Sequence, residues 1–516
     1  MANPALIPDA VRQQRARAVL VLCCFAASLG LYAITCAPGL LWQDSAMFQY
    51  RVLRFNLAGD IGLPLAHPLY IVLAKPLAAL PLGDLAFRVN LFSAFCGAIA
   101  IALLADLLIL LTRNAWAAVI GAISLAVSHT FWMHSVIAEV YNLYTVGLFA
   151  ELWLVFRFFQ TKQLKWLILA ALANGLNLSN HLMAILHWPA YVGVLYWGFK
   201  ERALKPLHLV PILAALAAGS SLYLYLIAAE LGKGRPTLDV FREALVGPPH
   251  RAKHVLEYSF PWEKQIRNSV IYFGLNFPTP LILLAPIGLA FAWQKPILSH
   301  WTKLAGAFFV VAFIFAFRYT VPDQFAFFTP CYALVALFIG LGAVEITRRS
   351  KGGRIVCIAF ALLPVLVYEA APRLLRERGI SIGLSREIVY RDNYDYFIRP
   401  RKNGYRGTER YAREALERAG PSGLIYADTT IINALIFARD IGRVQPDVVL
   451  LGAWDIEPDP PKIEGTAESM WPYVDERRAW STVPDSNYVS KWIRAQFTTE
   501  PDGLLYRIVP KPTGTN

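Results

Sequence analysis

Charged residues are scarce in this sequence: they make up 16% of its 516 residues, whereas soluble globular proteins carry about 25%. Hydrophobic residues make up 56%, and several apolar runs reach about 20 residues, the length that spans the hydrocarbon core of a bilayer. The shortage of charge therefore excludes an ordinary soluble protein over most of the chain. It indicates an all-α polytopic membrane protein surrounded by membrane lipids.

Cysteine is also rare, and patterns of metal ligands are missing. The six cysteines lie within or at the ends of apolar runs, at Cys23, Cys24, Cys36, Cys96, Cys331 and Cys357. This placement predicts small core residues rather than disulfides. His129 and His134 do not have the i, i+4 spacing that puts two ligands on one helix face, so no zinc site is expected. The chain also lacks a glycine-rich phosphate loop and an internal repeat.

The net charge of +13 does not indicate a nucleic-acid partner, because the basic residues form small groups between apolar runs rather than one patch. Such groups mark the cytoplasmic turns of a membrane protein. Arg12, Arg15 and Arg17 precede the first apolar run and place the N-terminus in the cytoplasm. That run is long, and no clear small-residue cleavage site follows it, so we expect a retained helix rather than a signal peptide.

The apolar runs predict about eleven transmembrane helices within residues 1–370. A semi-polar first outer loop at 37–87 and a polar outer loop from Glu230 to Asn268 interrupt them. Each predicted cytoplasmic turn carries Lys or Arg, in agreement with the positive-inside rule. The expected spans cover 18–36, 88–111, 115–134, a run ending at Arg157, two runs that flank Asn177–His181 and end at Lys200, 207–229, 269–293, a run ending at Arg318, a run ending at Arg348, and 354–370.

After Ala371 the composition changes to that of a soluble protein, and residues 371–516 are expected to form a small α/β domain. An odd number of spans places this domain outside the cytoplasm, in the periplasm if the chain sits in a bacterial inner membrane. The pattern predicts helices and strands in alternation, with helices at 407–419 and 431–440 and strands at 423–428 and 447–451.

Asp44 follows the first span and stands between Trp42 and the pair Met47 and Phe48. A carboxylate at this depth is costly unless it has a function. Asp is also a favoured N-cap, and a short helix is expected to begin at Ser45. The stretch by itself leaves a catalytic role and a capping role equally supported.

Two further carboxylates in aromatic surroundings, Glu139 and Asp323, fall on the same outer face. Trp132 and Tyr141 near Glu139 indicate partial burial and favour a functional role over a turn residue that faces water. Asp323 follows Pro322. A Pro-Asp pair is common in turns, so a turn role and a functional role for Asp323 are equally supported.

Two histidines also lie on or near this face. His67 precedes Pro68, which is expected to hold its backbone extended, and it either binds an anionic group or shapes the loop. His181 belongs to a polar cluster with Asn177, Ser179 and Asn180. This cluster either belongs to a site or satisfies buried polar groups at a bend.

Several motifs together carry a resemblance. They are Asp44, His67-Pro68, Arg88-Val89-Asn90-Leu91, Phe131-Trp132, Ala138-Glu139-Val140-Tyr141, Gly175-Leu176 through Asn180-His181, Tyr319 through Phe328, Asp392-Asn393-Tyr394 and Arg443 through Val448. This pattern resembles a membrane-protein family long described as a domain of unknown function, whose eukaryotic members include an endoplasmic-reticulum protein O-mannosyltransferase. The family is similar to glycosyltransferases of the GT-C class, which take a sugar from a lipid-phosphate carrier at the outer membrane face.

The resemblance implies a GT-C-like enzyme that moves a sugar from a polyprenyl-phosphate donor to a protein or glycan acceptor. It implies that Asp44 is the catalytic carboxylate and that Glu139 and Asp323 line the same cavity. Asp44 has the chemistry of a base for the acceptor proton. The resemblance does not decide whether the reaction uses a divalent ion, because GT-C relatives differ in requiring one. Further candidates for substrate binding, several of them cationic groups for the leaving phosphate, are Tyr141, His67, His181, Arg51, Arg54, Arg88 and Arg318.

Two departures from the family pattern leave the sugar and the acceptor undetermined. Many members continue the aspartate as Asp-Ser-Gly-Glu and read His-Pro-Pro-Gly, where this chain has Asp44-Ser45-Ala46-Met47 and His67-Pro68-Leu69-Tyr70. One rival function is a transporter or flippase of lipid-linked sugars, which typically has broken helices with midplane charges and repeated halves. Carboxylates gathered at one face favour the enzyme. The other rival is an inactive relative that acts as a scaffold.

Overall fold

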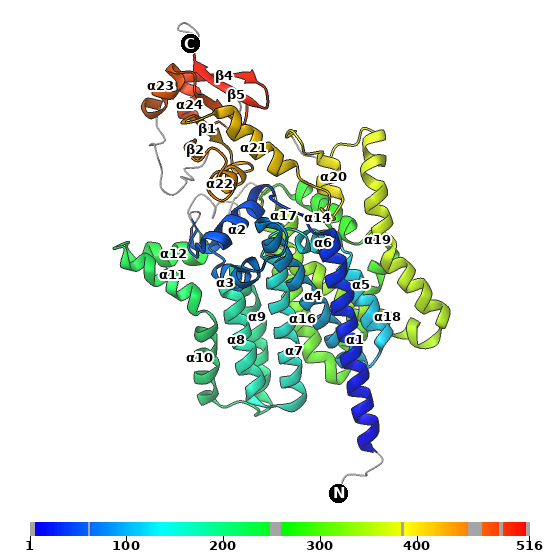
Figure 1. Cartoon of the computed structure of the whole chain (residues 1–516). Coiled ribbons are helices and arrows are strands. Elements are labelled where there is room, and N and C mark those ends of the chain that lie inside the picture. Colours follow the sequence, from blue (N-terminus) through cyan, green and yellow to red (C-terminus); the bar gives the residue numbers. More distant parts are fainter. Residues whose placement is uncertain are drawn as a thin grey trace.

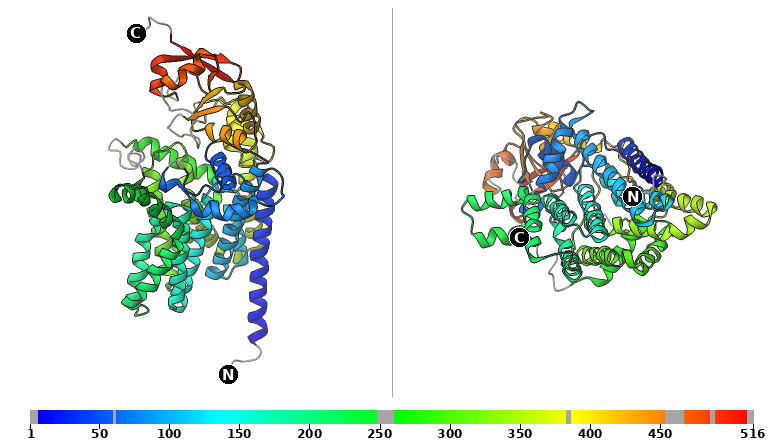
Figure 2. Two further views of the ribbon diagram at one scale, coloured as in Figure 1. Left: turned by 60° about the vertical axis from the view of Figure 1, so that its left-hand side comes forward. Right: turned by 90° about the horizontal axis from the view of Figure 1, so that it is seen from below.

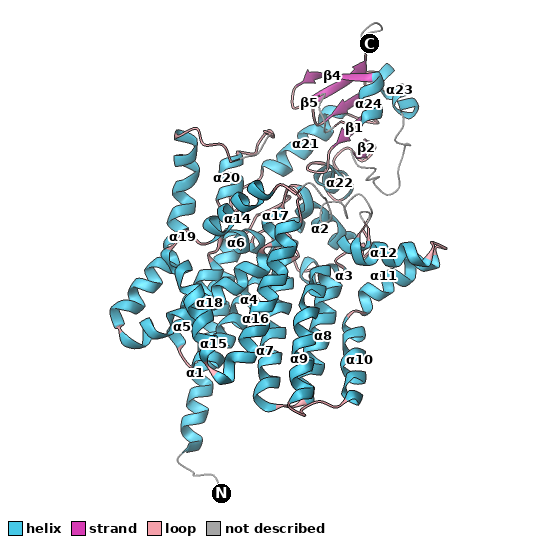
Figure 3. Ribbon diagram, turned by 180° about the vertical axis from the view of Figure 1, so that it is seen from behind, coloured by secondary structure: helices cyan, strands magenta, loops and turns pink. Residues whose placement is uncertain are grey.

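The computed structural model describes residues 6–59, 62–247, 260–382, 386–452, 467–484 and 489–511. A bundle of helices carries a small domain with a β-sheet at one end, and the N-terminus lies at the opposite end (Figure 1). The described strands all belong to the C-terminal part of the chain (Figure 3).

Seven helical segments in the described residues are long and apolar enough to cross a membrane. α18 is the most enclosed of them, with 89% of its apolar window buried, so it forms the centre of the bundle. The seven are α1 (Leu6–Thr35), α4 (Leu85–Thr112), α7 (Tyr141–Thr161), η2 with α9 (Leu182–His187 and Trp188–Lys200), α16 (Pro296–Arg318), α18 (Thr329–Arg349) and α19 (Lys351–Glu377).

Three more spans are present in the described residues if each bent pair of helices is counted as one span. The sharpest bend, 114°, has Pro278 and Pro280 at its break, and proline supplies no N–H to continue a helix. The other two pairs bend by 72° and 69°. In chain order the pairs are α5 (Ala115–Ala126) with α6 (His129–Ser135), η3 and α10 (Pro206–His208 and Leu209–Gly219) with α11 (Ser221–Gly232), and α14 (Trp262–Asn276) with η4 and α15 (Pro280–Leu283 and Leu284–Gln294).

The described residues therefore hold up to ten spans, against about eleven predicted. The remaining predicted span corresponds to α8 (Leu164–Asn180), whose 17 residues lie at the short end of the range of about 17–25 residues for a span. α8 packs between α7 and α10. Two glycines allow the close approach: a Cβ on Gly175 would lie 2.2 Å from the carbonyl of Leu216, and one on Gly219 2.4 Å from that of Leu172. The predicted polytopic helical class is confirmed.

Short helices lie at the end of the bundle nearest the C-terminal domain (Figures 1 and 2). Three of them fall in the predicted first outer loop. The predicted polar loop between 230 and 268 is partly helical, and its residues 248–259 lie outside the described ones. The short helices are α2 (Gln43–Arg54), η1 (Leu63–Leu65), α3 (Pro68–Ala78), α12 (Thr237–Val246) and α17 (Gln324–Phe327).

The C-terminal part contains a five-stranded sheet in the order β2-β1-β3-β5-β4. β1 is parallel to β2 and β3, while β5 is antiparallel to β3 and β4. The predicted small α/β region is confirmed. The elements are α20 (Asn393–Ile398), α21 (Gly407–Ala419), β1 (Leu424–Ala427), α22 (Ile432–Asp440), β2 (Val449–Gly452), α23 (Ala467–Asp475), β3 (Ala479–Ser481), α24 (Lys491–Gln496), β4 (Phe497–Asp502) and β5 (Leu505–Pro510).

Two predictions about the chain as a whole have different outcomes. The six cysteines all lie in described residues and are free, as predicted; four are buried, while Cys23 is exposed and Cys24 half-buried on α1. The domain boundary predicted at 370 stays a prediction. α19 runs through that position as one helix and ends at Glu377.

Candidate active site

Asp44 lies in the first turn of α2, at the end of the bundle nearest the C-terminal domain. The helix begins at Gln43 with Trp42 as its N-cap, so the alternative role of Asp44 as the cap of a helix from Ser45 is wrong. Asp44 is exposed to solvent. A carboxylate in a first turn is still stabilised by the positive end of the helix dipole.

Glu139 lies in the non-helical link between α6 and α7 and is half-buried. Its N–H donates to Ser93 Oγ at 3.0 Å, and its carbonyl accepts from the same hydroxyl at 3.2 Å. The hydroxyl of Tyr70 lies 2.9 Å from Ser93 Oγ. Ser93 of α4 and Tyr70 of α3 therefore fix the backbone that carries Glu139. Neither residue stood out in the sequence, since a buried hydroxyl has no distinctive spacing.

Asp44 and Asp323 both act electrostatically on Glu139. Burial raises the pKa of Glu139 well above its ordinary value, and the negative charges of Asp44 and Asp323 raise it further. Charges separated by more than a Debye length, about 8–10 Å, are largely screened. Asp44 and Asp323 therefore both contribute to the local electrostatic field at Glu139. Asp323 reaches it from the turn before α17, where it occupies the N-cap position.

His67 has a left-handed backbone, with φ 48° and ψ 46°, so the extended conformation expected before Pro68 is wrong. A tertiary contact overrides the local preference: His67 Nδ1 lies 2.6 Å from the carbonyl of Asn180. Asn180 Nδ2 in turn donates to the carbonyl of Val140, beside Glu139, at 3.1 Å. Burial, with a smaller contribution from Arg51, lowers the pKa of His67 to about 4. The ring is therefore neutral near pH 7 and offers no positive charge to a phosphate.

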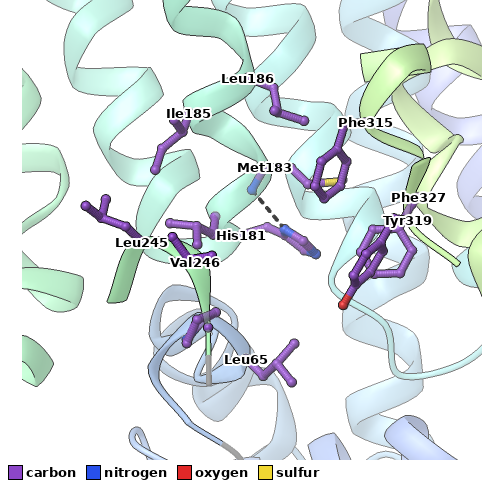
Figure 4. A pocket seen from close by; sticks show the side chains of 13 residues that line it. Leu65, His181, Met183, Ile185, Leu186, Leu245, Val246, Phe315, Tyr319 and Phe327 are labelled. Atoms are coloured by element: carbon purple, nitrogen blue, oxygen red, sulfur yellow. Dashed lines mark hydrogen bonds between the residues drawn. The ribbon is translucent and has the colours of Figure 1, made fainter. Parts of the chain in front are cut away.

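His181 lies where α8 ends and lines a cavity of about 190 Å³ (Figure 4). Its Nδ1 accepts the N–H of Met183 at 3.1 Å, so the proton of the neutral ring is on Nε2. Figure 4 shows the ring with Tyr319 and Phe327 on one side and Leu245 and Val246 on the other. The remaining walls are apolar and come from Pro64, Leu65, Leu182, Met183, Ile185, Leu186, Gly247 and Phe315.

Tyr141 begins α7 and stacks on His134, with ring centroids 4.9 Å apart and planes 18° apart. The rings of His181 and Phe327 lie 5.4 and 5.8 Å from that of Tyr141. His134 is buried, and its Nδ1 has no hydrogen-bond partner among the described residues. The sequence pattern spoke only against a metal role for His134 and did not indicate its place beside Tyr141.

Arg51 and Arg88 direct their guanidinium groups at backbone carbonyls. Arg51 is buried and closes the loop between α2 and α3, where it donates to the carbonyls of Asn56, Leu57, Leu65 and Ala66 at 2.5 to 3.3 Å. Arg88 closes the turn between α3 and α4, where it donates to the carbonyls of Ala78, Leu82 and Gly83. These contacts hold loops in place, and the role of both arginines in phosphate binding stays a prediction.

No group of three His, Cys, Asp or Glu side chains in the described ranges is arranged to hold a metal ion. Asp44 and Asp323 both contribute to the field at Glu139, but the three carboxyl groups do not converge on one point as metal ligands do. The described residues do not fit the divalent ion that the resemblance left open, and no step of the reaction is derived through one.

Residues 60–205 match the family described as Protein O-mannosyl-transferase TMEM260 N-terminal domain. The predicted resemblance is confirmed. The matched segment contains His67, Glu139, Tyr141 and His181, while Asp44 and Asp323 lie outside it. The Protein O-mannosyl-transferase TMEM260 of Mus musculus is 26% identical over 227 residues, which are 41% of this chain and 31% of that protein. The chain thus covers about a third of the length of this curated relative.

The solved structure of ArnT from Cupriavidus metallidurans bound to undecaprenyl phosphate is similar to this chain, with a TM-score of 0.55. The similarity covers 84% of this chain and 86% of ArnT at 12% sequence identity. At this identity the likeness establishes the fold alone. It confirms the predicted GT-C-like architecture, a helical membrane bundle with a small domain at one end.

Proposed function

We propose that this chain is a GT-C-type glycosyltransferase that moves a sugar from a polyprenyl-phosphate donor to a hydroxyl of a protein or glycan acceptor. The observation that carries the proposal is the local field at Glu139, to which Asp44 and Asp323 both contribute beneath the C-terminal domain. The names of the relatives support it. The mouse relative is a protein O-mannosyl-transferase, and the ArnT of similar fold was bound to undecaprenyl phosphate.

Asp44 acts as the base in the proposed reaction. The acceptor hydroxyl passes its proton to the Asp44 carboxylate while its oxygen forms a bond to C1 of the sugar. The bond between C1 and the phosphate oxygen breaks, and its electron pair leaves with the polyprenyl phosphate. The exposed first turn of α2 leaves Asp44 accessible to an acceptor from the side of the C-terminal domain.

Glu139 and His181 stabilise the departing phosphate. Glu139 keeps its proton to a higher pH than an ordinary glutamate and can donate it in a hydrogen bond. His181 presents Nε2–H as a second donor. Arg318 directly precedes Tyr319 of the cavity wall and supplies the positive charge that such a leaving group needs. We assign to Asp323 the binding of the hydroxyl groups of the sugar.

The apolar cavity beside His181 holds the first isoprene units of the donor. Its walls match the chemistry of an isoprenoid, and burial of apolar surface stabilises such a contact. Tyr141 packs against the His181 ring and provides an aromatic face for the sugar. In this arrangement the phosphate lies between the cavity and the carboxyl groups.

We place the site outside the cytoplasm, on the periplasmic side if the membrane is a bacterial inner membrane. The support is the group of Arg12, Arg15 and Arg17 at the opposite end of α1, which the positive-inside rule assigns to the cytoplasm.

A transfer assay tests the function. The full chain is incubated with undecaprenyl phosphate carrying radiolabelled mannose, or other sugars in turn, and with membrane extract as acceptor. Asp44→Asn keeps the shape of the side chain but cannot take a proton, and it should lower transfer about 10²–10⁴-fold. Ser45→Ala is the neighbouring control. Near-normal transfer by Asp44→Asn would remove Asp44 as the base, and no transfer from any polyprenyl donor would contradict the function.

A further inference from the structure

The C-terminal domain contacts the helix that carries Asp44. β1 lies between β2 and β3 and is parallel to both; the chain leaves β1 toward β2 on one side and leaves β3 toward β4 on the other. The carboxyl end of such a strand is where α/β folds place ligand-binding side chains. In this chain the segment that follows β1, Asp428 to Thr430, meets α2 instead, and α22 packs against α2.

Asp428 gives this segment its shape. The residue is 1% exposed, and its Oδ1 accepts the N–H of Thr430 at 3.1 Å. Its carbonyl accepts the N–H groups of Ile431 and Ile432 at 3.0 and 2.9 Å, at the start of α22. Arg386 forms an ion pair with the carboxylate and also donates to the carbonyl of Thr482 at 3.1 Å. An ion pair between a buried carboxylate and a partly exposed guanidinium therefore fixes the loop.

The C-terminal domain holds the two residues that precede Asp44, and the loop from Asp428 to Thr430 holds the second of them. The carbonyl of Thr430 accepts the N–H of Gln43 at 3.0 Å. Gln43 has φ 55°, a left-handed conformation that is unfavourable for a residue with a Cβ and persists only where its surroundings enforce it. Trp42 donates to the hydroxyl of Tyr405 at 2.5 Å, and its ring meets that of Tyr411 edge to face at 5.5 Å.

We propose that Asp428 is a positioning residue for glycosyl transfer. It shapes the loop so that Thr430 holds Gln43 in its left-handed conformation, and this conformation directs the Asp44 carboxylate toward the acceptor. The proposal rests on the proposed function of Asp44 as the base. It gives the C-terminal domain a part in the reaction through the backbone of α2, without a substrate contact of its own.

Kinetics of full-length variants test the proposal, with undecaprenyl phosphate mannose as donor and membrane extract as acceptor. Asp428→Ala should lower kcat about 10- to 100-fold, because a small displacement of a catalytic group costs rate rather than donor affinity. KM for the donor should stay unchanged. Combining it with Gln43→Gly should restore much of the lost kcat, since glycine adopts φ 55° without the help of the loop.

Arg413→Ala is the matched control, because Arg413 is an exposed residue of α21 in the same domain, and kcat should be unchanged. An unchanged kcat in Asp428→Ala overturns the proposal. So does a loss of kcat that Gln43→Gly does not restore, because it would mean that Asp428 only keeps the domain folded.

Hydrogen exchange gives a readout that does not depend on transfer. The amide of Gln43 should exchange faster in Asp428→Ala than in the wild type or in Arg413→Ala, because its hydrogen bond to Thr430 is weakened. An unchanged exchange rate overturns the positioning role alone. If the wild-type protein transfers no sugar from any polyprenyl donor, the proposed function fails, and the exchange measurement still decides whether Asp428 orders α2.

Discussion

At the scale of single residues, Glu139 shows how the fold changes the chemistry of a common side chain. Its backbone is fixed by Ser93, its side chain is half-buried, and two aspartates act on it. Burial and like charges both disfavour the ionised form. Glu139 therefore differs from an exposed glutamate by environment alone, and this difference is measurable as a pH effect on stability.

Glu139→Gln should make stability less dependent on pH. The folded-state pKa of Glu139 is raised, so between its ordinary pKa and the raised value the folded chain binds more protons than the unfolded chain. Stability should then fall as pH rises through this window, and glutamine removes that fall. Unfolding temperatures in detergent from about pH 5 to pH 8 measure it. Glu417→Gln, an exposed site on α21, is the control, and an equal slope in the wild type and Glu139→Gln would contradict the prediction.

At the scale of elements, helix pairs in the bundle are joined by small residues and by buried polar groups. Glu151 of α7 is fully buried and accepts hydrogen bonds from Asn174 and Asn177 of α8, His187 of η2 and Tyr191 of α9. Four donors compensate the cost of a carboxylate at this depth. The polar residues before His181 thus satisfy buried groups, as one of the two sequence interpretations proposed.

Gly175→Ala should destabilise the contact between α8 and α10. The added Cβ would lie 2.2 Å from the backbone carbonyl of Leu216, so the two helices must separate. We expect a loss of about 1–3 kcal/mol, as for other overpacked sites. Thermal unfolding in detergent measures it. Gly193→Ala of α9 is the control, since its Cβ would meet Trp197 at an ordinary 3.6 Å. Equal unfolding temperatures for the two variants would show that α8 and α10 adjust without cost.

At the scale of the whole molecule, the N-terminus and the C-terminal domain lie at opposite ends of the helix bundle (Figures 1 and 2). The carboxyl groups of the proposed site lie at the end that carries the domain. One orientation in the membrane therefore places the site and the domain on the same side, and the basic N-terminus on the other.

Alkaline phosphatase fused to the C-terminus should be active, because the C-terminal domain is assigned outside the cytoplasm. The same reporter fused after Arg202, in the turn between α9 and α10, should be inactive, because that turn lies at the end of the bundle where the N-terminus is found. A fluorescent protein that folds only in the cytoplasm should give the opposite results. The reverse pattern would invert the topology and place Asp44 in the cytoplasm.

The sequence by itself determined the membrane class, the positions of the apolar helices and the helices and strands around β1 and β2. These depend on runs and periods of neighbouring residues, which act locally. It also determined that Asp44, Glu139 and Asp323 lie at one end of the bundle, because span order and basic turns assign each loop to a side. The short strands β3, β4 and β5 carried too little pattern for prediction.

Only the tertiary structure decided how the site is held. Trp42 and Tyr405 are 363 positions apart and share a hydrogen bond, and the bond from Gln43 to Thr430 spans a similar distance along the chain. The left-handed backbone of His67 follows from its contact with Asn180, against the preference that Pro68 imposes. Such contacts depend on which helices meet in space. The free energy of one distant hydrogen bond or packing contact is as large as that of a local backbone preference, so the contact can override the preference.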